Sequence, residues 1–209
     1  MQTLGKILIL NGSPHEKGTT RRAIDEVARV LENENFSITI HTVGHLDVKG
    51  CRACGGCAKL GRCVFDDEVN ELAKEFCEAD GIIIASPVYY AAPNGAFLAL
   101  LNRLFYSTKF DKTMKVGASI VAARRAGLVA SFDVLNKYFS ISGMPVVSAY
   151  YWDQIHGKSY EEAEGDLEGL DTMRSLGKNM AFLIKAIKDA KEKYTCPEKP
   201  KKVYTNFIR

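Results

Sequence analysis

The sequence predicts an α/β fold in which a five-stranded parallel sheet lies between two layers of helices. The chain has 209 residues, of which 46% are hydrophobic and 25% are charged, the balance of one globular domain with a substantial core. Short apolar runs alternate along the chain with longer stretches of helical periodicity. Because parallel strands need a crossover connection, and helices are the usual crossover, this alternation favours a three-layer arrangement.

The first unit is a strand, a helix and a strand. Residues 6–10 read KILIL, which is typical of a strand buried on both faces, and they run into the loop 11–20. Thr19 or Thr20 can cap a helix predicted over residues 21–34, where apolar residues recur at helical spacing. Residues 37–42, SITIHT, alternate like a second strand of the same sheet.

The alternation of strands and helices continues along the chain. Apolar spacing predicts a second helix around 69–76, a third strand over 81–86 and a third helix over 95–106. It then predicts a fourth strand over 115–122, a fourth helix over 129–140, a fifth strand over 145–149 and a final helix over 166–194. We therefore expect one domain over residues 1–194 and a C-terminal tail over 195–209. A solvated tail is favoured over docking of Tyr204, Phe207 and Ile208 on this or a neighbouring subunit.

Charge and hydropathy exclude several classes of function. The formal net charge is +3, and the basic residues are spread along the chain except near its C-terminus, unlike the charge footprint of a nucleic-acid binder. The apolar runs are far shorter than the roughly 20 residues that a membrane span needs. Met1 is followed almost at once by a strand pattern rather than a signal peptide. We expect a cytoplasmic protein that binds neither nucleic acid nor membrane.

The loop after the first strand reads NGSPHEKGTT and lies where open parallel sheets bind ligands. It matches neither the nucleoside-triphosphate P-loop nor the dinucleotide pattern GxGxxG. It offers hydroxyl groups, two candidate cations at His15 and Lys17, and the amides of a helix N-terminus, a combination that suits a phosphate monoester. The alternative is an ordinary capped turn, since Gly-Ser-Pro and Gly-Thr-Thr are common turn and cap sequences.

Four cysteines lie within thirteen residues, at positions 51, 54, 57 and 63. Thiolates two residues apart can wrap one soft metal centre, and Gly55 and Gly56 permit the backbone angles that such wrapping needs. In a reducing cytosol, clustered cysteines are more often metal ligands or redox groups than disulfides. The spacing predicts redox or metal chemistry without naming the metal.

Four motifs follow one another along the chain. They are GSP, GTT, CxxCxxCxxxxxC with Asp66-Asp67 after it, and SPVYYAAPNGAFLALLNRL. Over roughly residues 6–190, this pattern resembles the NAD(P)H-dependent FMN reductase-like branch of the flavodoxin-like fold, and especially its iron-sulfur flavoproteins. The resemblance implies a flavodoxin-like sheet with strand order 2-1-3-4-5 and helices on both faces.

The resemblance also implies an FMN site built from three loops. The first would hold the phosphate through Ser13, His15, Lys17, Gly18, Thr19 and Thr20. The second would meet the isoalloxazine ring through Pro87, Val88, Tyr89 and Tyr90, with Asn94 opening the next helix. The third, Ala123, Arg124, Arg125 and Gly127, would approach the ring closely. Without the resemblance, the tyrosines read equally as core and rim, and each arginine as a solvated surface residue.

For the cysteines the resemblance adds a specific candidate. In iron-sulfur flavoproteins such a loop holds a [4Fe-4S] cluster, here through Cys51, Cys54, Cys57 and Cys63, and the cluster exchanges single electrons with FMN. Two alternatives stay open. One is a tetrahedral zinc site, which more often uses two separated CxxC pairs, and the other is a set of thiols without metal.

The function that follows is an FMN-containing oxidoreductase that uses NAD(P)H as cosubstrate to reduce a flavin, a quinone or another small acceptor. FMN would supply the chemistry, so the sequence names no catalytic side chain. The alternative is a flavoprotein electron carrier that serves a ferredoxin-like protein partner without oxidising NAD(P)H itself. The resemblance further implies a homodimer or homotetramer, and the aromatic run Tyr150, Tyr151 and Trp152 is a candidate contact.

Overall fold

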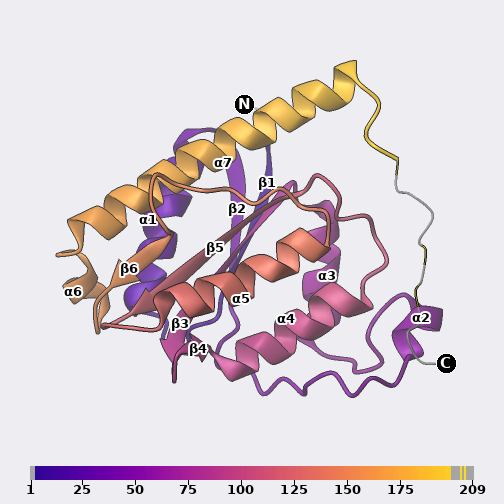
Figure 1. Cartoon of the computed structure of the whole chain (residues 1–209), viewed down its shortest axis with the longest axis horizontal. Coiled ribbons are helices and arrows are strands. Elements are labelled where there is room, and N and C mark those ends of the chain that lie inside the picture. Colours follow the sequence, from indigo (N-terminus) through magenta and orange to yellow (C-terminus); the bar gives the residue numbers. More distant parts are fainter. Residues whose placement is uncertain (1–2, 199–202, 204, 206–209) are drawn as a thin grey trace.

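The computed structural model describes residues 3–198, 203 and 205, and it confirms the α/β fold (Figure 1). Five strands run parallel in the order β2-β1-β3-β5-β6. Their bounds are β1 Gly5–Asn11, β2 Phe36–Thr42, β3 Gly81–Tyr89, β5 Val116–Ala123 and β6 Gln154–His156. The two-residue β4, Ala92–Pro93, pairs antiparallel with the end of β3. Among the parallel strands alone, the order is the predicted 2-1-3-4-5, and β4 is the addition.

The predicted fifth strand, residues 145–149, is wrong. That segment makes a single isolated bridge between Val146 and Gly117, and the fifth strand of the sheet is β6, which pairs with β5 from Val121 and Gln154 onward. Residues 145–149 have the more apolar pattern, whereas β6 has one buried apolar residue, Ile155, between two polar ones. A three-residue edge strand is too short for hydrophobic periodicity to reveal.

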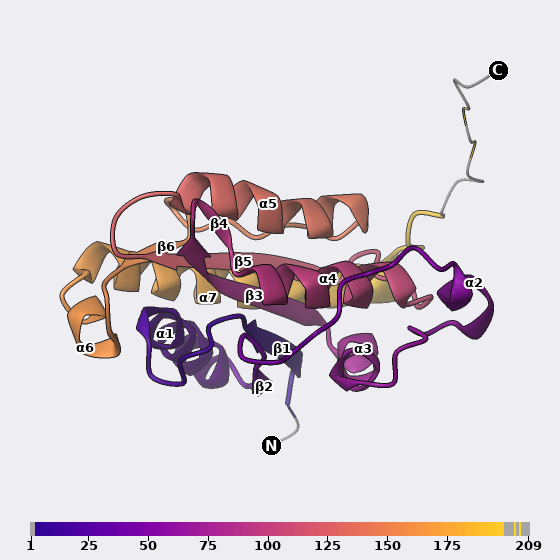
Figure 2. The ribbon, with the colours of Figure 1, turned by 90° about the horizontal axis from the view of Figure 1, so that it is seen from below.

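The five predicted helices are present with shifted ends. They are α1 Thr19–Asn33, α3 Glu68–Glu78, α4 Gly95–Ser107, α5 Leu128–Ile141 and α7 Leu167–Lys193. Two short helices were not predicted, namely α2 Gly56–Leu60 inside the cysteine loop and α6 Tyr160–Ala163 before α7. Figure 2 shows α2 at one end of the molecule and α6 at the other.

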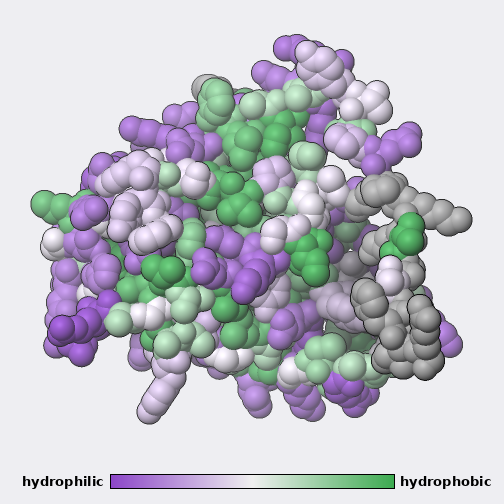
Figure 3. Space-filling view, viewed as in Figure 1, coloured by the Kyte–Doolittle hydropathy of each residue, from purple (hydrophilic) through white to green (hydrophobic). Residues whose placement is uncertain are grey.

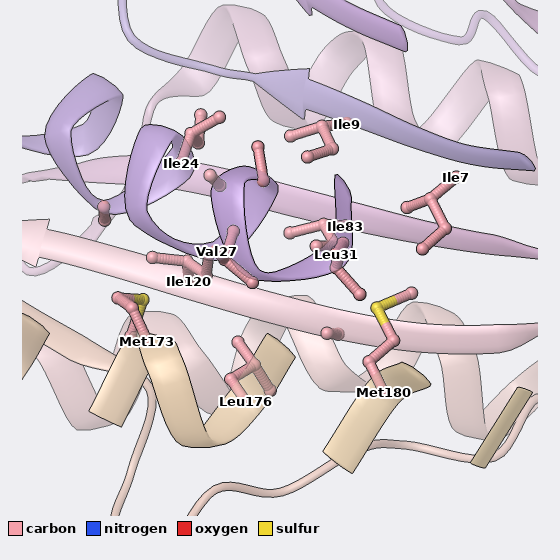
Figure 4. Close-up of a cluster of buried hydrophobic side chains, with 14 of the residues drawn as sticks. Ile7, Ile9, Ile24, Val27, Leu31, Ile83, Ile120, Met173, Leu176 and Met180 are labelled. Carbon is pink, nitrogen blue, oxygen red and sulfur yellow. The ribbon is translucent and has the colours of Figure 1, made fainter. Parts of the chain in front are cut away.

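Helices cover both faces of the sheet, and successive side chains of its central strands point alternately to one face and the other. Ile7 and Ile9 of β1 point into a core with α1 and α7, where Met173, Leu176 and Met180 pack against the sheet (Figure 4). Leu8 and Leu10 point the other way, into a core with α3, α4 and α5. Burying each such side chain contributes about 1.5–3 kcal/mol, so this alternation accounts for much of the fold's stability.

Within the described residues, neither the outer surface nor the C-terminal tail carries a long apolar helix. Hydrophilic and hydrophobic residues are mixed over the visible face (Figure 3), and no helix within the described residues is long and apolar enough to span a membrane. The described part of the tail, residues 195–198, 203 and 205, has no helix or strand. Tyr204, Phe207 and Ile208, the residues of the docking alternative, lie outside the described residues.

Candidate functional site

The loop after β1 is fixed by hydrogen bonds of its own. The Ser13 backbone N–H donates to Asn11 Oδ1 at 3.0 Å, and the His15 N–H donates to Ser13 Oγ at 3.2 Å. The loop leads into α1, whose N-cap residue Gly18 supplies no side-chain cap and whose first turn holds no acidic residue. No side chain caps the backbone N–H groups of that turn, so they can bind an anion.

The predicted phosphate residues differ in their exposure. Ser13, Thr19 and Thr20 are buried, whereas His15 and Lys17 are exposed at the edge of the loop. The Thr19 hydroxyl donates to the carbonyl of Ser159 at 3.1 Å, so its oxygen still has room to accept. The segment around Ser159 was missed from the sequence. It lies 140 residues further along the chain, and only the fold brings it beside this loop.

The second and third loops are packed together. Pairing of Val88 with Pro93 and of Tyr89 with Ala92 makes a tight hairpin, whose turn residues Tyr90 and Ala91 have φ of 49° and 61°. Gly127, at the start of α5, has φ of 89°, and an added Cβ there would lie 2.8 Å from Val88 Cγ1. Glycine is therefore required at 127 both by the backbone angle and by the approach of the hairpin.

The exposed side chains of these two loops face solvent. Tyr90 is fully exposed, Tyr89 is partly exposed, and burial of its ring raises the pKa of the Tyr89 hydroxyl. Pro87, Val88 and Ala123 are half-buried, and Arg124 and Arg125 are exposed. A tyrosine with left-handed φ is uncommon, and such strain is concentrated at functional positions.

Asn94 connects the first loop to the second. Its amide Nδ2 donates to the carbonyls of Gly12 at 2.8 Å and Gly44 at 3.0 Å, and its Oδ1 caps α4 by accepting the N–H of Ala96 at 3.1 Å. Its backbone N–H donates to Oγ of Ser86, within β3, at 3.0 Å. Asn94 is buried with its amide fully occupied, so the structure places it behind the loops as a residue that positions them.

The four cysteines line one small pocket, with about 20 Å³ of free space. Cys51 and Cys54 are exposed, Cys57 is half-buried and Cys63 is buried, and all are free thiols. Within the described residues, no three His, Cys, Asp or Glu side chains already stand together as a metal site. Four soft donors around a single pocket are nevertheless the donor set that fits one thiophilic metal centre or cluster.

The pocket's electrostatics favour negatively charged sulfur. The backbone N–H of Gly56 and then the guanidinium of Arg52 hold the pKa of Cys54 below its ordinary value. Cys63 Sγ accepts a hydrogen bond from Arg103 Nε at 3.2 Å. Asn70 fixes the backbone at Cys63, with its Oδ1 accepting the Cys63 N–H at 3.0 Å and its Nδ2 donating to the Cys63 carbonyl at 3.2 Å.

Arg103 and Asn70 were missed from the sequence. Arg103 lies in a leucine-rich helix pattern and Asn70 in a helix start, and neither carries a local signal that points to the cysteines. The position of Arg103 within an apolar helix face is the one sequence signal that indicates a role for it.

The two sites lie at opposite ends of α4. Asn94 begins this helix beside the first two loops, and Arg103, Tyr106 and Ser107 near its end line the cysteine pocket. The helix has 13 residues. At about 1.5 Å of rise per residue, its ends are roughly 20 Å apart, and Figure 1 shows α2 well away from β4.

This architecture defines a class of protein. An open parallel sheet whose strands β1, β3 and β5 end in converging loops, with an anion-binding position at the start of α1, is the arrangement of flavodoxin-like FMN proteins. The family model described as NADPH-dependent FMN reductase matches residues 5–157, and the chain belongs to that family.

Curated relatives carry a more specific name. An iron-sulfur flavoprotein of Methanocaldococcus jannaschii is 30% identical over 191 residues, covering 88% of this chain and 99% of the relative. An iron-sulfur flavoprotein of Methanosarcina thermophila is 29% identical over 194 residues, covering 90% of this chain and 100% of the relative.

Solved structures share the fold. RosB, solved with bound 8-demethyl-8-formylriboflavin-5'-phosphate, has a TM-score of 0.69 at 20% identity, covering 98% of this chain and 94% of RosB. A WrbA-like flavodoxin from Agrobacterium tumefaciens has a TM-score of 0.61 at 17% identity, covering 87% and 98% of the two chains. At these identities the likeness establishes the flavodoxin-like fold alone.

Proposed function

We propose that this flavoprotein is an FMN-dependent oxidoreductase that takes electrons from NADH or NADPH and passes them to a flavin, a quinone or another small acceptor. The observation that carries the proposal is the uncapped N-terminus of α1 at the point where three loops converge. Helix N–H groups and the helix dipole suit the phosphate of FMN, whose bound ring supplies hydride and one-electron chemistry.

The residues proposed to hold FMN are those of the three loops. Backbone and hydroxyl groups around Ser13, Gly18, Thr19 and Thr20 would bind the phosphate, with the exposed His15 and Lys17 adding positive charge. The hairpin would support one edge of the ring through Pro87, Val88, Tyr89 and Tyr90. The loop of Ala123, Arg124, Arg125 and Gly127 would close the other edge, where an arginine stabilises negative charge on a reduced flavin. Asn94 would act through the loops that it holds.

We also propose that Cys51, Cys54, Cys57 and Cys63 hold a [4Fe-4S] cluster, which supplies one-electron transfer when bound. Support comes from the four sulfurs around one pocket, from the guanidinium groups beside it, and from the name shared by the curated relatives. Zinc through the same sulfurs is the competing occupant, and an iron measurement separates the two.

A second candidate is an electron carrier that serves a ferredoxin-like protein and does not oxidise NAD(P)H itself. The observation in its favour is that the cysteine pocket opens at the surface through Cys51 and Cys54, away from the loops proposed to hold FMN. A protein partner can approach that pocket without displacing the flavin.

The first experiment is an ultraviolet-visible spectrum of anaerobically purified protein with FMN, iron and acid-labile sulfide analysis. Flavin bands with about four irons and four sulfides per chain support both proposals, and flavin bands without iron leave only the first. Stopped-flow mixing with NADH or NADPH then decides between the oxidoreductase and the carrier. Flavin bleaching within seconds supports the oxidoreductase, and a flavin that stays oxidised for minutes contradicts it.

We further propose that the chain works in the cytoplasm as a homodimer or homotetramer, with residues 1–194 as the flavin domain. The support for an oligomer is the exposed aromatic run Tyr150, Tyr151 and Trp152, since exposed aromatic clusters are enriched at protein interfaces.

A further inference from the structure

Arg103 is an unusual residue for its position. It lies on α4 with 1% of its surface exposed, among the largest fully buried side chains of the described residues. A buried guanidinium is costly unless its donors are paired, because it loses its hydration. The partners of its N–H groups therefore indicate the role of Arg103 in the structure.

Within the described residues, its hydrogen bonds and its ring contact reach residues 49–67, the segment that contains the cysteines. Nη1 and Nη2 each donate to a different carboxylate oxygen of Asp67 at 2.7 Å, a bidentate pair. Nη1 also donates to the carbonyl of Lys49 at 3.2 Å, and the guanidinium lies 4.8 Å from the centre of the Phe65 ring. Arg103 thus joins the start of the cysteine loop to its end.

The third nitrogen has a different partner. Nε donates to Cys63 Sγ at 3.2 Å, so this N–H is directed at one of the four sulfurs. A neutral thiol is a weak acceptor for a charged donor, whereas a metal-bound thiolate carries the negative charge that such a donor matches. Cys63 is also the buried member of the set, where a hydrogen bond is least weakened by water.

We infer that Arg103 is a positioning residue for the cysteine site, which holds Cys63 Sγ toward the pocket and donates an N–H···S bond that raises the reduction potential of the bound cluster. The inference rests on the proposed [4Fe-4S] site. Hydrogen bonds to ligand sulfurs and nearby positive charge stabilise the reduced, more negative form of a cluster, so they make it easier to reduce. Arg103 would thereby set how readily the cluster accepts an electron.

The test compares Arg103→Lys with the matched control Arg62→Met. Lysine keeps the positive charge but has a single donor group that cannot pair with Asp67 and reach Cys63 together. Arg62 belongs to the same loop, is exposed, and pairs with Asp66 rather than with a cysteine. Each protein is purified anaerobically, its FMN, iron and sulfide are counted, and the cluster's midpoint potential is measured by redox titration monitored by electron paramagnetic resonance.

For Arg103→Lys with full FMN and iron, we expect the oxidised-to-reduced ratio of the cluster at a fixed potential to rise about tenfold, a fall of about 59 mV for one electron. Arg62→Met should change that ratio by less than about threefold, because an exposed charge is screened. A potential of Arg103→Lys equal to that of the wild type overturns the inference, as does an equal shift in both variants.

If Arg103→Lys keeps FMN but loses iron, a second variant, Asp67→Asn, separates the two causes of the loss. Asp67→Asn weakens the ion pair with Arg103 and leaves the contact between Arg103 and Cys63 Sγ. Iron lost from Arg103→Lys and kept in Asp67→Asn supports the inference. Iron lost equally from both overturns it, since the ion pair alone then explains the loss.

If Arg103→Lys does not fold, the wild type labelled with ¹⁵N-arginine provides the test. Pulsed electron paramagnetic resonance should detect guanidinium nitrogen coupled to the reduced cluster, and the coupling should persist in Arg52→Met. Its absence overturns the inference. Failure of the proposed site is distinguishable, because a wild type that binds FMN but no iron after anaerobic reconstitution removes the cluster, and this inference with it, before any variant is compared.

Discussion

Asp153 is a buried acid without a compensating charge. It is fully buried, and within the described residues neither of its carboxylate oxygens has a partner of hydrogen-bonding geometry. Burial, the larger effect, raises its pKa to about 8, and the backbone N–H of Ala149 acts in the opposite direction. The backbone carbonyl of Asp153 accepts the Val121 N–H at 3.0 Å, so β5 fixes this residue in place. Because the raised pKa lies above 7, the carboxyl group is protonated at pH 7.

This acid should make the protein less stable as the pH rises. Between its unfolded pKa of about 4 and its folded pKa near 8, the folded state holds a proton that the unfolded state has lost. The free energy of unfolding should therefore fall by up to about 1.4 kcal/mol per pH unit from this group alone. We expect Asp153→Asn to flatten the pH dependence and to be the more stable protein at pH 8, as measured by urea unfolding from pH 5 to 9. Parallel curves for the two proteins would contradict this.

Asn94 should matter for both stability and flavin binding. Asn94→Ala removes the cap of α4 and leaves the Gly12 and Gly44 carbonyls without their donor, a loss of about 3 kcal/mol in the free energy of unfolding. The FMN dissociation constant should rise at least about tenfold, because the first loop loses its anchor. Asn102→Ala, on the exposed side of the same helix, should cost under about 1 kcal/mol. Equal effects of the two variants on FMN titrations would refute the anchoring role.

At the scale of elements, α7 packs closely on α1 because a glycine lies between them. Glu26 of α1 ties the pair further through Arg174 of α7, at 2.6 Å between Oε1 and Nε. At Gly177, an added Cβ would lie 2.9 Å from both Cβ and Cγ1 of Val30. Helix propensity therefore conflicts with packing at this position.

We expect Gly177→Ala to destabilise the protein. Alanine gains about 1 kcal/mol of helix propensity, but overpacking against Val30 costs about 1–3 kcal/mol, so the net loss should be about 1 kcal/mol. Gly95→Ala is the matched control, since an added Cβ at the start of α4 meets nothing within 4 Å. That variant should be neutral or slightly stabilised. A higher urea midpoint for Gly177→Ala than for the wild type would show that α7 can move away from α1 at no cost.

At the scale of the whole molecule, the two proposed redox sites are separated by α4, and the aromatic run 150–152 precedes the edge strand β6. Tyr151 and Trp152 are about half exposed, and their ring centroids are 5.0 Å apart. Trp152 is the only tryptophan of the chain, so its emission reports on this surface alone.

If the proposed oligomer forms through this surface, Trp152 emission should be blue-shifted at high protein concentration and should move to longer wavelength on dilution, together with a fall in mass by light scattering. Tyr151→Glu should give a monomer, because a charge would be buried unpaired at the contact. Phe182→Ser removes an exposed apolar residue of α7 and serves as the control. A mass that falls on dilution while the emission stays constant would place the contact elsewhere.

The sequence by itself determined the architecture and the place of the proposed cofactor loops. Runs such as KILIL are apolar on both faces, and only a sheet covered by two helix layers buries both, so strands β1, β3 and β5 could be predicted. Alternation predicted β2, and helical periodicity predicted the five long helices. Strand geometry indicated the loop at 13–20, and the resemblance to the FMN reductase-like family implied the loops at 87–90 and 123–127.

Tertiary structure alone decided the contacts between distant segments. Edge strand β6 replaced residues 145–149, because pairing with β5 rather than local hydropathy selects an edge strand. The use of Asn94 as an anchor, the contact of Ser159 with Thr19, and the bond from Arg103 to Cys63 join residues between 40 and 140 positions apart. Periodicity reports which way a side chain faces within its own element, and it carries no information about which polar group of another element it will meet.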